Sequence, residues 1–199
     1  MADLLAKIGL DKLERALVYG VILAVVFAVI FRAIYLDHGW FAFLFRWLHV
    51  ISGVMWVGLL WYFNFVQIPS MPKIPDEQKP AISKVIAPEA LFWFRWAALS
   101  TVVTGLILAL MNGYLFNAIL FSGGGKERLI GLGMWLGLIM AFNVWYIIWP
   151  NQQKALGMVE ASADEKKAAA RIAMLTSRFN TMLSIPMLYC MVGAQNLAF

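Results

Sequence analysis

Long apolar stretches constrain the fold of this chain more than any other feature. A helix needs about 20 consecutive, mainly apolar residues to cross the hydrocarbon core of a membrane. Five stretches qualify, at residues 16–36, 41–67, 90–111, 129–149 and 179–198. Hydrophobic residues make up 62% of the chain and charged residues 14%, whereas a soluble domain is about half apolar and a quarter charged. The sequence therefore predicts an all-α, polytopic membrane helix bundle with about five transmembrane helices, forming a single transmembrane domain over residues 1–199.

Polar segments and helix-breaking residues separate the predicted spans. We expect breaks at a group of prolines after the second span, at Asn112 and Gly113 after the third, and at Pro150 after the fourth (the prolines are Pro69, Pro72, Pro75 and Pro80). Residues 114–121 are too few to cross a membrane and should lie in its interface. The charged stretches 76–88 and 164–171 should lie at the surface, the second as a helix. Pro186 should kink the last span.

Basic residues are distributed unevenly between the two sides of this arrangement. Twelve lie on the side of the N-terminus and of the loops between the second and third and between the fourth and fifth spans, with Arg95 counted at the start of the third span: Lys7, Lys12, Arg15, Lys73, Lys79, Lys84, Arg95, Lys154, Lys166, Lys167, Arg171 and Arg178. Four lie on the other side: Arg32, Arg46, Lys126 and Arg128. Cytoplasmic loops carry the excess of Lys and Arg. We therefore expect a cytoplasmic N-terminus, a periplasmic C-terminus and a first span that serves as an uncleaved signal anchor in a bacterial inner membrane.

The net charge of +5 has the same explanation, so it does not indicate a nucleic-acid partner. The lipid bilayer is the partner that the composition predicts. The single cysteine, Cys190, excludes an intrachain disulfide, a c-type haem and an iron–sulfur cluster held by this chain alone. No set of catalytic residues can be recognised, so the catalytic residues stay unknown.

His49 is the candidate for chemistry inside the membrane. At 100° per residue it shares a helix face with Gly53 and Trp56, and an ionisable residue at membrane depth is a functional candidate by default. Gly53 leaves room for a flat ring, so one interpretation is that His49 is an axial ligand to the iron of a b-type haem. The other is that its imidazole bonds a polar group on a neighbouring helix and holds the bundle together.

The remaining spans supply partners for either interpretation. Met187 or Met191 could provide a second haem ligand, although most methionines are packing residues. A seam of polar residues interrupts the apolar helices, namely Asn64, Thr104, Asn143, Asn180 and Ser184. Gly133, Gly137 and Ala141 form a small-residue contact face that is available to another helix or subunit.

Three segments together carry a resemblance to a known family. They are residues 48–66, which contain LHVISGVMWVG and YFNFV, residues 143–154 (NVWYIIWPNQQK) and residues 177–188 (SRFNTMLSIPML). The chain resembles the urate oxidase N-terminal family, the membrane part of bacterial urate hydroxylases, which in longer members is followed by a cytochrome c domain. The resemblance extends over residues 41–195.

The resemblance implies a membrane redox role, with His49 at the position of the family's membrane histidine. It also implies an oxidoreductase of the urate hydroxylase type that does not act alone, because no cytochrome c domain lies within these residues. We expect electron exchange with a periplasmic cytochrome or another membrane subunit. The alternative is a cofactor-free accessory subunit of a larger membrane complex.

Overall fold

The structure is a computed structural model that describes residues 2–31 and 33–198, and within these residues it contains helices and turns but no strand. The chain divides into two compact units, Met1–Phe41 and Ala42–Phe199. Among the described residues, four helices are long and apolar enough to cross a membrane: Leu13–Ile30, His38–Lys73, Lys79–Met111 and Gly125–Ala155. The all-α prediction is confirmed, and these helices have the length and composition that a multi-pass membrane protein needs. Each corresponds to one of the first four predicted spans.

The first unit contains a short helix, α1 (Ala2–Lys7), and the first membrane-crossing candidate, α2 (Leu13–Ile30). Within this unit, no residue of α2 is buried. The prediction that this span continues to residue 36 is wrong, because α2 ends at Ile30. The connection that follows includes Leu36 at φ 50°, and Asp37 then accepts a 2.8 Å hydrogen bond from the backbone N–H of Trp40, which caps the next helix. Arg32 lies outside the described residues.

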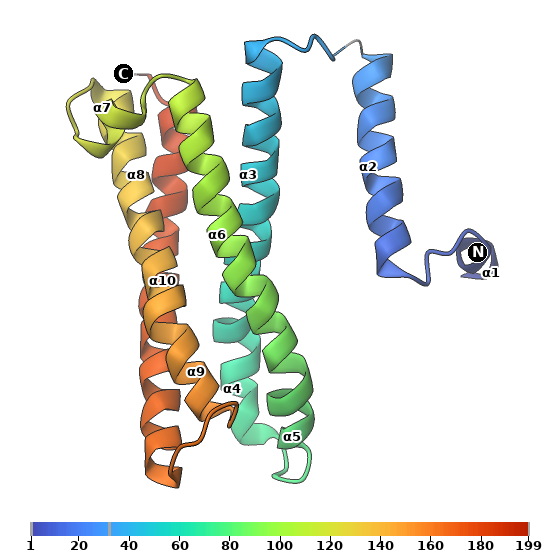
Figure 1. Cartoon of the computed structure of the whole chain (residues 1–199), viewed down its shortest axis with the longest axis vertical. Coiled ribbons are helices and arrows are strands. Elements are labelled where there is room, and N and C mark those ends of the chain that lie inside the picture. The colour runs from blue at the N-terminus through green and yellow to red at the C-terminus, as the bar shows by residue number, and fades with distance from the viewer. Residues whose placement is uncertain (1, 32, 199) are drawn as a thin grey trace. The chain divides into compact units, whose positions relative to one another are not determined.

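The second unit is a bundle of four long helices (Figure 1). They are α3 (His38–Trp61), α6 (Ala87–Met111), α8 (Gly125–Phe142) and α10 (Ala163–Asn196). The short helix α7 (Leu115–Ile119) joins α6 to α8 and, as predicted for residues 114–121, is too short to cross a membrane. The third span ends as predicted, since α6 stops at Met111 and Gly113 has a φ of 74°. We refer below to the α7 end and the α9 end of the bundle.

The predicted breaks at Pro69 and Pro150 are wrong, because the helices continue through both prolines. After α3 the chain passes through the π-helical segment η1 (Tyr62–Gln67) into α4 (Ile68–Ser70) and the 3-10 turn η2 (Met71–Lys73). After α8 it passes through η4 (Asn143–Ile148) into α9 (Trp149–Ala155). Before α6, the chain forms α5 (Lys79–Ala81) and η3 (Ile82–Ile86), and Pro88 follows. The segment around 76–88 is therefore largely helical.

All three π-helical segments end two residues before a proline. In each, the N–H of the residue before the proline bonds the carbonyl five residues back: Ile68 to Phe63, Ala87 to Ile82 and Trp149 to Val144. A proline in a regular α-helix lacks one N–H, and its ring collides with the carbonyl four residues earlier. The wider π turn relieves both problems. Each helix consequently continues through its proline.

The last long helix, α10, joins two elements that were predicted separately. It begins with a capping box in which Ser162 and Glu165 bond each other's backbone N–H groups, and it continues without interruption to Asn196. The predicted surface helix at 164–171 is thus the first part of the helix that holds the predicted fifth span. Pro186 lies inside it.

Close helix packing explains where the small residues lie. Gly131 and Gly133 of α8 are both buried. A Cβ on Gly131 would collide with the carbonyl of Ala118, and one on Gly133 would lie 2.9 Å from Cβ of Cys190 in α10. The expectation that the Gly133, Gly137 and Ala141 face is open to another subunit is therefore wrong, because Gly133 and Gly137 are buried within this bundle.

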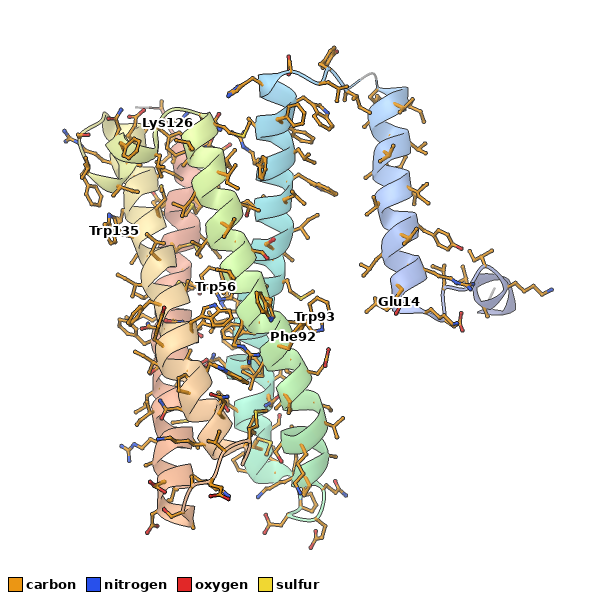
Figure 2. All side chains as sticks on the ribbon, viewed as in Figure 1. Glu14, Trp56, Phe92, Trp93, Lys126 and Trp135 are labelled. Carbon is orange, nitrogen blue, oxygen red and sulfur yellow. The ribbon has the colours of Figure 1, made fainter. Side chains whose placement is uncertain are left out.

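The apolar core occupies the α9 end of the bundle and reaches its middle. It is built mainly from large side chains of α3, η1, α6, α8 and η4, namely Trp56, Val57, Leu60, Phe63, Leu91, Phe94, Met140, Val144 and Ile148, with Ala98 and Met187. Figure 2 shows Trp56 among the helices, whereas Trp135 projects outward from α8. The α7 end contains the cavity described next.

Candidate ligand cavity beside His49

A cavity of about 590 Å³ lies between α3, α6, α8 and α10. This volume is in the range of small-molecule and cofactor sites, about 300–1,000 Å³. The cavity brings together every residue that the sequence singled out for cofactor binding: His49, Gly53, Trp56, Met187 and Met191. Those residues come from α3 and α10 and are more than 120 positions apart in the chain, so their meeting is a property of the fold.

The His49 side chain is tied to the neighbouring helix α6. Its Nδ1 lies 2.8 Å from the carbonyl oxygen of Thr101. A carbonyl only accepts hydrogen bonds, so Nδ1 carries the proton and donates it, and Nε2 is left with a free lone pair. This bond is the helix-to-helix contact that one interpretation of His49 predicted. The same bond also fixes the tautomer in which an imidazole can bind a metal through Nε2.

Gly105 creates the space for the His49 ring. A Cβ at this position would lie 2.8 Å from Cε1 and 3.0 Å from Nδ1 of His49. Gly53, which was expected to leave room for the flat ring of a haem, faces the methyl group of Thr101, which lies 3.8 Å from the ideal Cβ position of Gly53. The sequence places Gly105 and Thr101 on one face of the third span, because they are four residues apart. It does not indicate that Gly105 is the glycine that admits the imidazole.

The walls of the cavity consist of apolar side chains and glycines. Ideal Cβ atoms on Gly58 and Gly137 would meet nothing within 4 Å. Leu106, Leu138 and Leu188 are among the other lining residues. The hydroxyl of Thr101 donates to the carbonyl of its own helix at Ala97, 2.7 Å away. Besides the His49 imidazole, Trp56 is a lining residue with a free polar group, because its buried indole N–H has no hydrogen-bond partner.

Polar residues line the cavity at the α7 end. They are Arg46, one turn before His49 on α3, Tyr114 after α6, and Gln195 near the end of α10. Arg46 and Gln195 are exposed, which places them at the mouth. Burial raises the pKa of Tyr114, and the positive charge of Arg46 acts in the opposite direction.

Most of the predicted polar seam binds α10 to its neighbours. Asn143 donates to the side-chain oxygen of Asn180 at 2.7 Å, and Asn180 donates to the carbonyl of Met140 at 2.9 Å. Asn180 and Ser184 are completely buried. A buried amide that is satisfied in this way stabilises a membrane bundle, whereas an unsatisfied one destabilises it.

Two more bonds connect α10 to α3 and η1. The indole N–H of Trp61 donates to Ser184 at 3.0 Å, and the amide of Asn64 donates to Ser177 at 2.7 Å. Thr104, the remaining member of the seam, does not belong to this network. Its hydroxyl lies 3.5 Å from Nδ1 of His49 and donates to the carbonyl of Ser100 at 2.6 Å.

Within the described part of the chain, no three residues of the His, Cys, Asp and Glu types cluster to form a metal site. A metal in this cavity would therefore receive only one or two ligands from the protein. Haem iron is bound in this way, for example by one imidazole and one thioether sulfur. His49, Met187 and Met191 are the cavity residues that offer those donors.

Comparison with known proteins gives one match. The profile of the urate oxidase N-terminal family, described as "Urate oxidase N-terminal", matches residues 119–196. The match contains the segments 143–154 and 177–188 that carried the resemblance, while His49 and α3 lie outside it. No curated protein and no solved structure matches the chain. Residues 119–196 are therefore similar to the urate oxidase N-terminal family, the family that the sequence motifs at 143–154 and 177–188 resemble.

Proposed function

We propose that this chain is a redox protein of the bacterial inner membrane that holds a b-type haem in its cavity, with His49 as an axial ligand. The bond from His49 to the Thr101 carbonyl, beside a 590 Å³ apolar cavity, is the observation that carries the proposal. It holds the imidazole in the tautomer whose Nε2 can bind iron. The urate oxidase N-terminal match adds a family with a redox reaction in its name.

The residues present fit such a group in three respects. Nε2 of His49 is unprotonated, the thioethers of Met187 and Met191 line the same cavity, and Gly58 and Gly137 leave open space beside them. Haem in such a site would let this chain exchange single electrons with a periplasmic cytochrome or a partner subunit. The apolar walls would exclude water and thereby set the local dielectric.

The visible spectrum of the purified protein tests this proposal. We expect a Soret band from protein made in cells supplied with a haem precursor, and we expect His49→Ala to lose it. His38→Ala is the matched control, because His38 is the other histidine of the chain and does not line the cavity. Absence of the band, or an unchanged band in His49→Ala, would overturn the proposal. Separate Met187→Leu and Met191→Leu variants would identify a sulfur ligand by a shift in the reduced spectrum.

We also propose five spans, with the N-terminus in the cytoplasm and the C-terminus in the periplasm. Support comes from the twelve-to-four distribution of basic residues and from the outer face of α10. Met182, Ile185, Tyr189 and Val192 on that face are 59–64% exposed, while the polar residues that lower the hydropathy of this helix, Asn180 and Ser184, face the interior. The lipid-facing surface of α10 is therefore apolar.

Reporter fusions test this topology. Alkaline phosphatase joined after α10 should be active, because it is active only outside the cytoplasm, and green fluorescent protein joined there should be dark. The reverse result would place the end of α10 in the cytoplasm and contradict the five-span arrangement.

A cofactor-free accessory subunit is the second candidate. The observation that favours it is that Nδ1 of His49 and the buried amides of α10 already have hydrogen-bond partners in the protein alone. It predicts a protein that has no chromophore and co-purifies with a larger membrane complex. Isolation of a stable monomer with a Soret band would exclude it.

A further inference from the structure

The cavity is polar at one end only, which restricts the ligands that it can hold. Arg46, Tyr114 and Gln195 line its mouth at the α7 end. Beyond His49, the walls are apolar or glycine, apart from indole groups and the internally bonded Thr101. Among the described residues that line the cavity, Arg46 is the one with a permanent charge.

The chemistry of this arrangement favours one class of ligand. An apolar body gains free energy from each part of its surface that it buries against the walls. A guanidinium binds carboxylate and phosphate groups through paired, charge-assisted hydrogen bonds, and a phenol and an amide can add further donors. A cationic ligand would be repelled by Arg46, and an uncharged apolar ligand would leave the three polar side chains unused.

We propose that the ligand of this cavity is an anionic amphiphile that places its carboxylate or phosphate group against Arg46, while its apolar body lies along Gly58 and Gly137, which have open space beside them. The inference rests on the proposed function only in placing the ligand in the same cavity. The anionic group can come from the propionates of a haem or from the head group of a fatty acid or phospholipid. These sources share one chemistry, and experiment separates them.

The test compares charged and neutral forms of the same molecules on the purified full-length chain in an uncharged detergent. The pairs are haemin with haemin dimethyl ester, and oleate with methyl oleate, and oleyl phosphate is a third anionic probe. Tryptophan quenching reports haemin, since Trp56 and Trp61 line the cavity, and native mass spectrometry reports the lipids. We expect at least one anionic probe to bind about tenfold more tightly than its neutral form, the size of one charge-assisted hydrogen bond.

Substitutions of Arg46 test whether this preference for the anionic form arises at the mouth of the cavity. Arg46→Gln should reduce the affinity of the preferred anion to that of its neutral form, whereas Arg46→Lys should keep much of it. Arg128→Gln is the matched control, because Arg128 lies at the same end of the bundle, where its Nε donates to the carbonyl of Gly123, and does not line the cavity. Unchanged helical circular dichroism in Arg46→Gln shows that the loss does not come from unfolding.

The outcomes separate the inference from the proposed function. If haemin does not bind but oleate or oleyl phosphate binds with the expected preference, the haem proposal fails and the inference stands. If haemin binds and its ester binds equally well, in both the wild type and Arg46→Gln, the haem proposal stands and the inference is overturned. The inference is also overturned if no anionic probe binds, or if Arg128→Gln weakens binding as much as Arg46→Gln.

Discussion

Replacement of Gly105 by alanine tests the arrangement on which the candidate site depends. The new methyl group would lie 2.8 Å from Cε1 and 3.0 Å from Nδ1 of His49. Both distances are shorter than ordinary van der Waals contacts, so the imidazole has to move. Its movement lengthens or breaks the 2.8 Å hydrogen bond to the Thr101 carbonyl.

The magnitude follows from three contributions. Inserting a methyl group into a packed site costs about 1–3 kcal/mol. Loss of a side-chain hydrogen bond within a membrane bundle costs about 0.6–2 kcal/mol. Alanine stabilises a helix by up to about 1 kcal/mol relative to glycine, which offsets part of this loss. We therefore expect Gly105→Ala to lower the free energy of unfolding by about 1–4 kcal/mol.

Gly137→Ala is a matched control for this prediction. Gly137 also lines the cavity from within a long helix, but a Cβ there would meet no atom within 4 Å. Its effect should be limited to helix propensity, a gain of up to about 1 kcal/mol. Unfolding of both variants by sodium dodecyl sulfate in mixed micelles, followed by circular dichroism, measures the difference.

A double substitution identifies the cause. In a His49→Ala background the imidazole is absent, so Gly105→Ala should become neutral or slightly stabilising. This change in sign is the coupling between the two positions. The same destabilisation by Gly105→Ala with and without His49, or equal stability of Gly105→Ala and Gly137→Ala, would refute the packing of the ring on Gly105.

Two further predictions concern α10. Asn180→Ala removes the acceptor of Asn143 and leaves that buried amide unpaired. We therefore expect it to lower the free energy of unfolding by about 2–3 kcal/mol in the same micelle assay. A decrease no larger than that caused by substituting an exposed residue would contradict the network. The hydrogen bond from the Ser162 backbone N–H holds the pKa of Glu165 below its ordinary value, so the cap is complete at neutral pH and is lost as the pH falls through that lowered pKa. Hydrogen exchange should show the first turn of α10 opening in acid, and Glu165→Gln should remove the pH dependence without affecting the rest of the helix.

The fold could be predicted where the sequence itself restricts the backbone, as in long apolar stretches and at helix-ending glycines. Apolar stretches fix the number and approximate position of the helices, since the membrane leaves a backbone few alternatives to a helix. Asn112 and Gly113 end α6 as predicted, because a glycine readily adopts the left-handed conformation that closes a helix. Pro150 misled the prediction, because a π turn before it relieves the clash that would otherwise end the helix.

The residues of the site could be predicted from the sequence, but the way in which they pack against one another could not. The helical period placed His49, Gly53 and Trp56 on one face, and they do line one cavity. Which glycine admits the imidazole depends on the crossing of α3 and α6, and a periodicity within one helix contains no information on that crossing. Gly105 was consequently not recognised as that glycine, and the sequence did not show whether a helix of this chain or another subunit covers the Gly133 face, which α10 covers.

The structure separates the stabilising contacts of the bundle from its open space. The large apolar side chains and the amide network of Asn143 and Asn180 lie toward the α9 end and the middle, so α10 is held firmly there. Met187 follows Asn180 by two turns on the same face, at the border between the packed core and the cavity. A ligand site needs a rigid supporting shell to hold its residues in place. Substitutions at Asn180 should impair stability and ligand binding together, whereas those at Gly137, beside open space, should change binding while leaving the fold intact.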